Sequence, residues 1–215
     1  MSSKYLDMSP PVSAALKAGT PIAAIETGIF MQLSYPQNLT AMQDCEQAFW
    51  GGDCVPCFTA VIDGRLKAGL SREEMDRLCQ TRTVCSRVDL PEMVAEEKTA
   101  SLRPSGALAV AKMAGIVPVA SPGLAQDMAD VDALCAVGRL VFCSTLSMEA
   151  RRLYSQKGIP VLSELPPERL ADAYQIQRDL GVSESTVVPC AASMTDIARR
   201  AAAAAIALKR NTSFL

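Results

Sequence analysis

One carboxylate stands where an α/β protein is expected to do chemistry. The apolar run at residues 22–25 predicts a buried strand, and Glu26 follows it directly, with Thr27 and Gly28 next. An acid at a strand end is often only a solvated residue at a sheet edge. Open α/β sheets, however, bind ligands outside the carboxyl ends of their parallel strands. Glu26 is therefore a candidate catalytic acid if the rest of the chain predicts such a sheet.

A hydroxyl and a guanidinium adjoin after a second predicted strand. Ser86 and Arg87 follow the short run TVC, and arginine forms bidentate, charge-assisted bonds to phosphate oxygens. Such a pair is also common on protein surfaces. Ser121 opens a small turn after the strand-like run IVPVA, and this turn either offers backbone N–H groups to an anion or is a plain loop. Taken alone, the turn favours the plain loop.

Three acids follow that turn, at Asp127, Asp130 and Asp132. Carboxylates in such a group could bind a hard cation. They also suit the first turn of a helix, where the helix dipole favours negative charge. We favour the helix start and keep the cation site as the alternative.

The chain has eight cysteines and no histidine. Cys54 and Cys57 have the CxxC spacing of a redox or metal pair, but no second CxxC accompanies them. We therefore interpret both, and also Cys85, as small buried residues. Without histidine the chain cannot build a Ser-His-Asp or Cys-His site. Acid–base chemistry must use Glu, Asp, Lys, Tyr or Cys.

The composition limits the classes of function further. The chain has 215 residues, enough for one domain with a substantial core, and a formal net charge of −2. Acidic and basic residues are interspersed, which argues against nucleic acid or a membrane as partner. No apolar run approaches the roughly 20 residues that span a bilayer, and the N-terminal segment lacks the plan of a secretory signal. We expect a soluble, cytoplasmic protein.

Helical and strand-like patterns alternate along the chain, which predicts an α/β layer fold with a mostly parallel sheet. Asn38 is expected to cap a helix, and Ser71 and Glu74 have the spacing of a capping box. Helices are expected over 11–17, 39–50, 71–78, 106–114, 147–157, 167–180 and 195–209. Strands are expected over 22–25, 54–62, 65–70, 83–85, 116–121, 139–144, 159–164 and 185–190, the second and third joined by an Asp-Gly turn. No linker or repeat divides residues 1–215, so we expect a single domain.

Several stretches together resemble one known family. They are AAIETGIF…YPQN at 23–38, VPCFTAVIDGRLKAGLSREEMDRL at 55–78, SRVDLP at 86–91, KMAGIVPVAS at 112–121 and ADVDAL at 129–134. In order and spacing they resemble the pseudouridine-5'-phosphate glycosidase family, also called indigoidine synthase A-like. The resemblance covers nearly the whole chain, although the family's C-terminal segment is largely missing from it.

The resemblance implies a three-layer α/β/α fold, a homo-oligomer that is commonly a trimer, and a phosphorylated ribose or nucleoside as ligand. Members of the family break or make a C–C glycosidic bond between ribose 5-phosphate and uracil. They use a lysine Schiff base, a glutamate acid and a divalent metal, usually manganese, with no organic cofactor. A departing carbon needs an electron sink such as an imine, and a positioned acid can then protonate it.

The family's site residues match this chain unevenly. Glu26 matches the acid, and Asp130 ends a substrate triplet in which Met128 replaces a serine. The remaining matches bind the sugar phosphate or other parts of the substrate in the family: Ser86, Arg87, Pro104 and Ser121, the last in place of a threonine. The metal ligand corresponds to Asp127, or to Gln126 if the alignment is not shifted by one residue.

This chain differs from the family at positions where the family has functional lysines. Val84 stands where the family has a substrate-binding lysine, and the Schiff-base lysine falls in a deletion after the run VFCS. A substitute would have to come from elsewhere, and the lysines considered are Lys98, Lys112 and Lys157. Arg103 lies in the segment that faces the sugar in the family, and it could supply positive charge if its side chain points inward.

Three functions remain open. The first is a working C-glycosidase, for which the missing lysine leaves no electron sink. The second is a glycosidase or lyase of altered mechanism that binds a phosphorylated ribose or nucleoside and uses Glu26 as acid. The hydrolysis of an N- or O-linked glycoside, for example, needs no lysine. The third is a catalytically inactive binding or partner subunit. We favour the second over the third and the third over the first.

Overall fold

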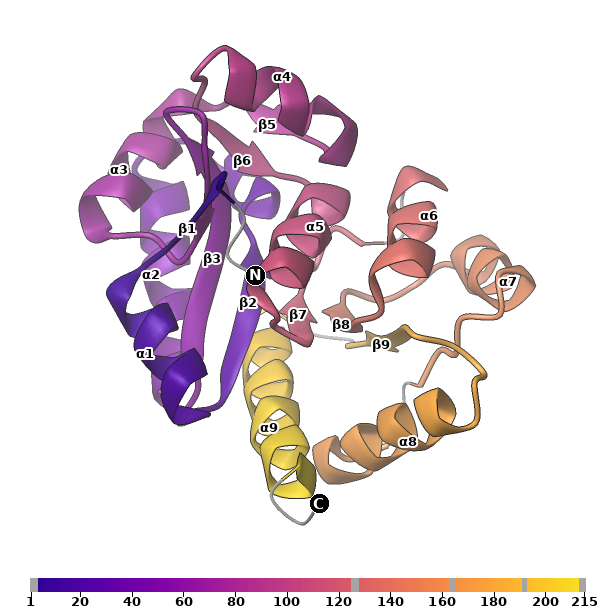
Figure 1. Ribbon diagram of the computed structural model, residues 1–215. Coiled ribbons are helices and arrows are strands. Elements are labelled where there is room, and N and C mark those ends of the chain that lie inside the picture. Colours follow the sequence, from indigo (N-terminus) through magenta and orange to yellow (C-terminus); the bar gives the residue numbers. More distant parts are fainter. Residues whose placement is uncertain (1–3, 125–127, 163–164, 191–192, 213–215) are drawn as a thin grey trace.

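Strands alternate with helices along the chain and build one sheet between two helical layers (Figure 1). This computed structural model describes residues 4–124, 128–162, 165–190 and 193–212. The three-layer α/β/α class predicted from the sequence is confirmed. None of the helices within the described ranges is both long and apolar enough to cross a membrane.

The sheet is mostly parallel. The described residues contribute nine strands, seven of them in the spatial order β1-β4-β3-β2-β7-β8-β9, while β6 pairs with β3 and with β5. Of the strand pairs in these described ranges, β3–β4 and β3–β6 are antiparallel and the others are parallel. The strands are β1 Leu6–Met8, β2 Ile22–Glu26, β3 Val55–Ile62, β4 Arg65–Ala68, β5 Val84–Cys85, β6 Ala100–Leu102, β7 Pro118–Ala120, β8 Leu140–Cys143 and β9 Thr186–Pro189.

Helices cover both faces of this sheet, and each layer has its own apolar cluster. On one face lie α1 Pro10–Ala18, α4 Leu90–Ala95, α5 Pro104–Ala114, α6 Met128–Val137 and α7 Met148–Gln156. On the other lie α2 Gln37–Trp50, α3 Arg72–Thr81, α8 Pro167–Asp179 and α9 Met194–Thr212. Two short 3₁₀ helices, η1 Gly28–Gln32 and η2 Arg87–Asp89, follow β2 and β5.

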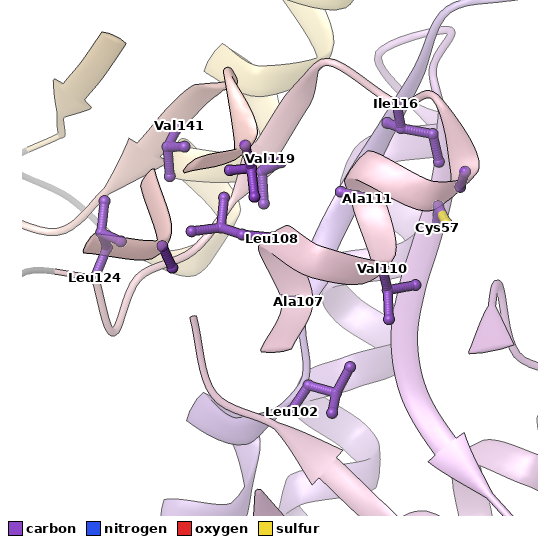
Figure 2. Packing of buried hydrophobic residues seen from close by; sticks show 14 of the residues in the cluster. Cys57, Leu102, Ala107, Leu108, Val110, Ala111, Ile116, Val119, Leu124 and Val141 are labelled. Atoms are coloured by element: carbon purple, nitrogen blue, oxygen red, sulfur yellow. The ribbon is translucent and has the colours of Figure 1, made fainter. Parts of the chain in front are cut away.

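Strand side chains alternate between the two layers because successive residues of a strand point to opposite faces. Val119 and Val141 face the layer of α5, whereas Ala120 and Phe142 face the layer of α9. Figure 2 shows Leu108 of α5 beside Val119 and Val141. Leu108 is fully buried, and a leucine buried in this way contributes about 1.5–3 kcal/mol to stability.

Thr27 closes the sheet where β2 ends. β2 pairs with β3 as far as Thr59, and beyond that point β6 takes the place of β2 beside β3. The Thr27 hydroxyl donates to the Thr59 carbonyl at 2.7 Å and accepts the Leu102 N–H at 2.9 Å. One buried side chain thereby satisfies two backbone groups at the junction. After Thr27 the chain leaves the sheet and continues as η1, so no described strand covers the carboxyl end of β2 at Glu26.

Two local sequence signals, one for a helix cap and one for a turn, are confirmed. Ser71 and Glu74 form the expected capping box at the start of α3, with Ser71 Oγ accepting the Glu74 N–H at 3.2 Å. The Asp63-Gly64 turn joins β3 to β4 as an antiparallel hairpin, and both residues have positive φ. Positive φ at both positions is what a two-residue hairpin turn requires.

The prediction that Asn38 caps α2 is wrong. The helix already begins at Gln37, and the Asn38 side chain is buried. Its amide donates to the Cys79 carbonyl at 2.8 Å and so satisfies a carbonyl in the last turn of α3. The residue therefore joins two helices instead of starting one.

The strand predicted at 159–164 is wrong over its described part. Val161 forms only an isolated bridge with Val187, flanked by bonds from Val187 N to Pro160 O and from Leu162 N to Val187 O. Pro160 has no N–H to extend a ladder. Conversely, β1 and β6 were not predicted, because three-residue runs carry too little pattern.

The cysteine pair is not a redox or metal motif. Cys54 and Cys57 are both fully buried and free, and they belong to the apolar clusters on opposite faces of the sheet. Burial raises the pKa of each thiol to about 12, which leaves them protonated and unreactive at neutral pH. Cys85 is likewise a buried free thiol. The interpretation of these three cysteines as core residues is confirmed.

Candidate functional site

The strand order reverses direction between β2 and β7. From β2 the chain crosses through α2 to β3 on one side, whereas from β7 it crosses through α6 to β8 on the other (Figure 1). The carboxyl ends of β2 and β7 therefore diverge into connections on opposite faces, and such a switch point is where open α/β sheets bind ligands. Glu26 is the last residue of β2, and Ser121 directly follows β7.

Glu26 is held rigidly at this switch point. Its side chain is almost completely buried, and Oε2 accepts the Ser121 hydroxyl at 2.7 Å and the Gly123 N–H at 3.1 Å. A Cβ atom on Gly123 would lie only 2.8 Å from Glu26 Oε1, so glycine allows the backbone to approach the carboxyl. The turn after β7 is thus not the plain loop that its sequence favoured, because its N–H group binds the protein's own acid.

Burial raises the pKa of Glu26 to about 7, and burial is the largest of the effects acting on it. The negative charge of Asp130 acts in the same direction. The bonds from Ser121 and Gly123 and the positive charge of Arg103 lower the pKa, but they do not outweigh burial. At neutral pH both the neutral and the charged carboxyl are populated, which suits a general acid or base.

We expect Ser121→Ala to raise the pKa of Glu26 further, by about one to two, because the Ser121 bond stabilises the charged carboxylate. Nuclear magnetic resonance titration of ¹³C-labelled glutamate would measure this, with Ser155→Ala on the exposed side of α7 as control. An unchanged or lowered pKa in Ser121→Ala would contradict the assigned bond.

Glu26 lines a cavity of about 280 Å³. Arg103 and Asp130 line the same cavity, so one guanidinium and two carboxyl groups face it. Its remaining described lining is mostly apolar or backbone: Gly28, Ile29, Met31, Gln32, Val84, Pro104 and Gly123. The space is sufficient for a small polar molecule, with charged groups on one part of the wall and apolar groups on the other.

The N-terminus of α5 forms the charged part of the wall. Arg103 is its N-cap residue and Pro104 its first residue. The backbone N–H of Ser105 donates to Asp130 Oδ1 at 3.0 Å, and the Ser105 hydroxyl accepts the backbone N–H of Arg87 at 3.2 Å. The structure therefore brings together Glu26, Arg103 and Asp130 with Pro104 and Ser121, five of the residues singled out from the sequence.

The side chains of Ser86 and Arg87 are not among the described lining of this cavity. The Ser86 hydroxyl donates to Asp89 Oδ2 at 2.7 Å, and the Ser86 N–H bonds to the same oxygen at the start of η2. The Arg87 side chain is exposed and lines a separate, mainly apolar groove between α4 and α5. Among the described lining residues of the Glu26 cavity, Arg103 is the cation. A phosphate-binding site at Ser86 and Arg87 thus stays a prediction, and the lining of the Glu26 cavity does not support it.

Comparison with known proteins decides the family. The family model for the indigoidine synthase A like protein matches residues 11–127. A pseudouridine-5'-phosphate glycosidase from Hahella chejuensis is 30% identical over 86% of this chain and 74% of its own length. The chain belongs to the indigoidine synthase A-like family. A second relative, pseudouridine-5'-phosphate glycosidase 2 from Photorhabdus laumondii, is 38% identical, over 58% of this chain and 41% of that protein.

Solved structures of the indigoidine synthase A-like fold superpose on nearly the whole chain. An indigoidine synthase A-like protein from Thermotoga maritima has a TM-score of 0.74 at 15% identity, covering 97% of this chain and 87% of its own. Prealnumycin C-glycosynthase in complex with ribulose 5-phosphate has the same TM-score and identity, covering 98% and 91%. At this identity the superpositions establish the fold alone.

The described lining of the cavity contains no lysine, in contrast to the Schiff-base chemistry that the family resemblance implies. The three lysines considered as substitutes are bonded elsewhere. Lys98 pairs with Glu92 at 3.0 Å, Lys157 pairs with Asp132 at 2.8 Å, and Lys112 donates to the Ala136 carbonyl at 2.6 Å. In this arrangement no described lysine is positioned to form an imine with a ligand beside Glu26.

The predicted metal ligand, Asp127, lies outside the described residues. Over the described ranges, no three His, Cys, Asp or Glu side chains gather closely enough to hold a metal ion. Two carboxyl groups face the cavity, but one oxygen of each already accepts backbone N–H bonds. The described residues alone therefore do not form a metal site, and a manganese ion stays a prediction. Asp130, on the other hand, lies in the first turn of α6, as the helix-start interpretation expected.

Sequence reasoning missed three residues that shape the site. Gly123 supplies an N–H and leaves room for Glu26, Ser105 links Asp130 to Arg87, and Thr27 closes the sheet beside the cavity. Gly123 had a recognisable signal, since it follows a predicted strand and a proline. Ser105 and Thr27 had none, because their partners lie far away along the chain.

Proposed function

We propose that this chain binds a phosphorylated ribose or a ribosyl nucleoside phosphate in the Glu26 cavity and acts on its glycosidic bond. Membership of a family of pseudouridine-5'-phosphate glycosidases supports the class of ligand. A structural relative, prealnumycin C-glycosynthase, was solved with ribulose 5-phosphate. In this proposal Glu26 is the proton donor to the departing group.

The protonation of Glu26 carries the proposal. Its pKa of about 7 leaves a large neutral fraction at neutral pH, which an ordinary exposed glutamate does not have. Both observed hydrogen bonds are accepted by Oε2, so the transferable proton of the neutral acid belongs on Oε1. A positioned acid of this kind contributes about 10²–10⁴-fold to a rate.

Arg103 is the group we assign to the phosphate. Its guanidinium faces the cavity at the N-terminus of α5, and both the side chain and the helix dipole favour an anion there. We expect Arg103→Gln to weaken the binding of ribose 5-phosphate by about 10–100-fold, since a charge-assisted bond contributes about 1.5–3 kcal/mol. Isothermal titration calorimetry would measure the dissociation constants.

Arg87→Gln is the matched control, because Arg87 is a nearby exposed arginine that lines a different groove. Its affinity should equal that of the wild type. The reverse result, loss of binding in Arg87→Gln alone, would move the phosphate site to Ser86 and Arg87. Absence of binding in the wild-type protein would overturn the proposed ligand class.

A second candidate is a catalytically inactive binding or partner subunit. The absence of lysine from the described lining favours it, because the family's electron sink is not in place. Borohydride reduction in the presence of ribose 5-phosphate, followed by mass spectrometry, tests for an imine. A trapped adduct would mean that a lysine does enter the site. Turnover that is lost in Glu26→Gln would exclude the inactive subunit.

The family resemblance implies two further properties, a bound divalent metal and a homo-oligomer, and we include both in the proposal. Titration of ribose 5-phosphate with and without Mn²⁺ would show whether a divalent metal supports binding. Light scattering coupled to gel filtration would show whether the chain forms the homo-oligomer, commonly a trimer, that the resemblance implies. Neither experiment depends on turnover.

A further inference from the structure

Two buried carboxyl groups face one cavity from different elements. Glu26 comes from the end of β2 and is 2% exposed, and Asp130 comes from the first turn of α6 and is 5% exposed. Buried carboxyl groups are unusual unless they are bonded or functional. The two groups interact electrostatically, since the Asp130 charge contributes to the raised pKa of Glu26.

The two carboxyl groups have different surroundings. Asp130 Oδ1 accepts the Ser105 N–H at the N-terminus of α5, where the helix dipole stabilises a negative charge. Burial is the largest effect on the pKa of Glu26, and it favours the neutral form. Two carboxyl groups at one cavity, one serving as acid and the other as base, are the arrangement of many glycoside-cleaving enzymes.

The described residues at the cavity supply no imine sink for a carbon leaving group. An N- or O-linked glycoside does not need one, because nitrogen or oxygen can depart once it is protonated. The site therefore carries the two groups that hydrolysis requires, together with the Arg103 cation for the phosphate. It lacks the group that C–C cleavage requires.

We infer that Asp130 is the catalytic base of this cavity and that the reaction is hydrolysis of an N- or O-linked ribosyl phosphate by water. This inference rests on the proposed function. Glu26 gives its proton to the departing nitrogen or oxygen as the bond from that atom to C1 of the ribose breaks. A water oxygen bonds to C1, and Asp130 takes a proton from that water. The products are ribose 5-phosphate and the protonated leaving group, and the two carboxyl groups exchange protons with solvent to complete the cycle.

The test compares two substrates that differ only in the bond to be broken. Uridine 5'-phosphate has a C1–N bond and pseudouridine 5'-phosphate a C1–C bond to the same base. We expect the wild-type chain to release uracil from uridine 5'-phosphate and not from pseudouridine 5'-phosphate, as measured by chromatography. Release from pseudouridine 5'-phosphate alone would overturn the inference while leaving the proposed function intact.

Asp130→Asn tests the assigned base. Asparagine keeps an oxygen that can accept the Ser105 N–H but cannot take a proton from water. We expect uracil release to fall by about 10²–10⁴-fold while the affinity for ribose 5-phosphate changes little. Asp132→Asn, an exposed change on the same helix, should keep the wild-type rate. Wild-type turnover in a folded Asp130→Asn protein would overturn the inference.

An azide experiment distinguishes a catalytic base at Asp130 from a residue that only positions α5. In Asp130→Ala, azide can enter in place of the activated water, and its attack on C1 needs no base. We expect azide to restore release of uracil and to yield ribosyl azide 5-phosphate, detectable by mass spectrometry. Failure of azide to restore a folded Asp130→Ala protein would count against the base. If wild type binds ribose 5-phosphate but cleaves neither substrate, the inference falls and the ligand assignment stands; if it does not bind, both fall.

Discussion

The Glu26→Gln protein should be more stable than the wild type above pH 7 and equally stable near pH 4. In the folded chain Glu26 keeps its proton up to about pH 7, whereas an unfolded glutamate, with a pKa of 4.5, releases it earlier. Between these values the folded state binds more protons, so the free energy of unfolding falls as the pH rises. The total loss is about 3 kcal/mol, and glutamine does not incur it.

Urea denaturation of both proteins at several pH values between 4 and 8.5 would measure this difference. Glutamine can still accept the Ser121 and Gly123 bonds through its amide oxygen, so the site should remain packed. Glu149→Gln, at an exposed position of α7, controls for the loss of a surface charge. Parallel stability profiles for wild type and Glu26→Gln would show that Glu26 does not titrate near neutrality.

The same change has the opposite effect on function. Glutamine cannot donate a transferable proton, so turnover should fall by about 10²–10⁴-fold in the variant that is the more stable one at neutral pH. A gain in stability together with a loss of activity is the behaviour expected of a residue kept for function and not for the fold. A variant that lost both together would instead point to a structural role.

Thr27→Val is expected to destabilise the chain by about 2–6 kcal/mol, although valine has nearly the same shape. The Thr27 hydroxyl is fully buried and bonds to both the Thr59 carbonyl and the Leu102 N–H. Valine leaves both backbone groups buried without this partner, and each such loss costs about 1–3 kcal/mol. The junction of β2, β3 and β6 should therefore open first.

Thermal and urea unfolding would measure the loss of stability. Hydrogen exchange at the Leu102 N–H would show whether the loss is located at this junction. Thr40→Val is the matched control, since the Thr40 hydroxyl is exposed on α2. A Thr27→Val protein within about 0.5 kcal/mol of wild type would mean that the junction can satisfy these groups in another way. In that case Thr27 would not be the residue that closes the sheet.

The class of fold and the candidate acid could both be predicted before any tertiary contact was known. Alternating strand-like and helical patterns predicted an α/β layer fold with a mostly parallel sheet, because periodicity and caps depend on residues that are close along the chain. The three-layer α/β/α arrangement was implied by the family resemblance. The capping box at Ser71 and the Asp63-Gly64 turn are confirmed for the same reason. Glu26 could be recognised as a candidate because it lies at the end of the strand that positions it.

The surroundings of Glu26 could not be predicted from the sequence. Its partners, Ser121 and Gly123, are more than 90 residues away, and they reach it because β2 and β7 are neighbours in the sheet. The sequence also could not decide between Arg87 and Arg103 as the cation of the cavity. Both follow predicted or short strands, but the packing of η2 and α5 turns one to a separate groove and the other to the site. Strand order and helix packing are set by contacts between distant residues, which no local pattern contains.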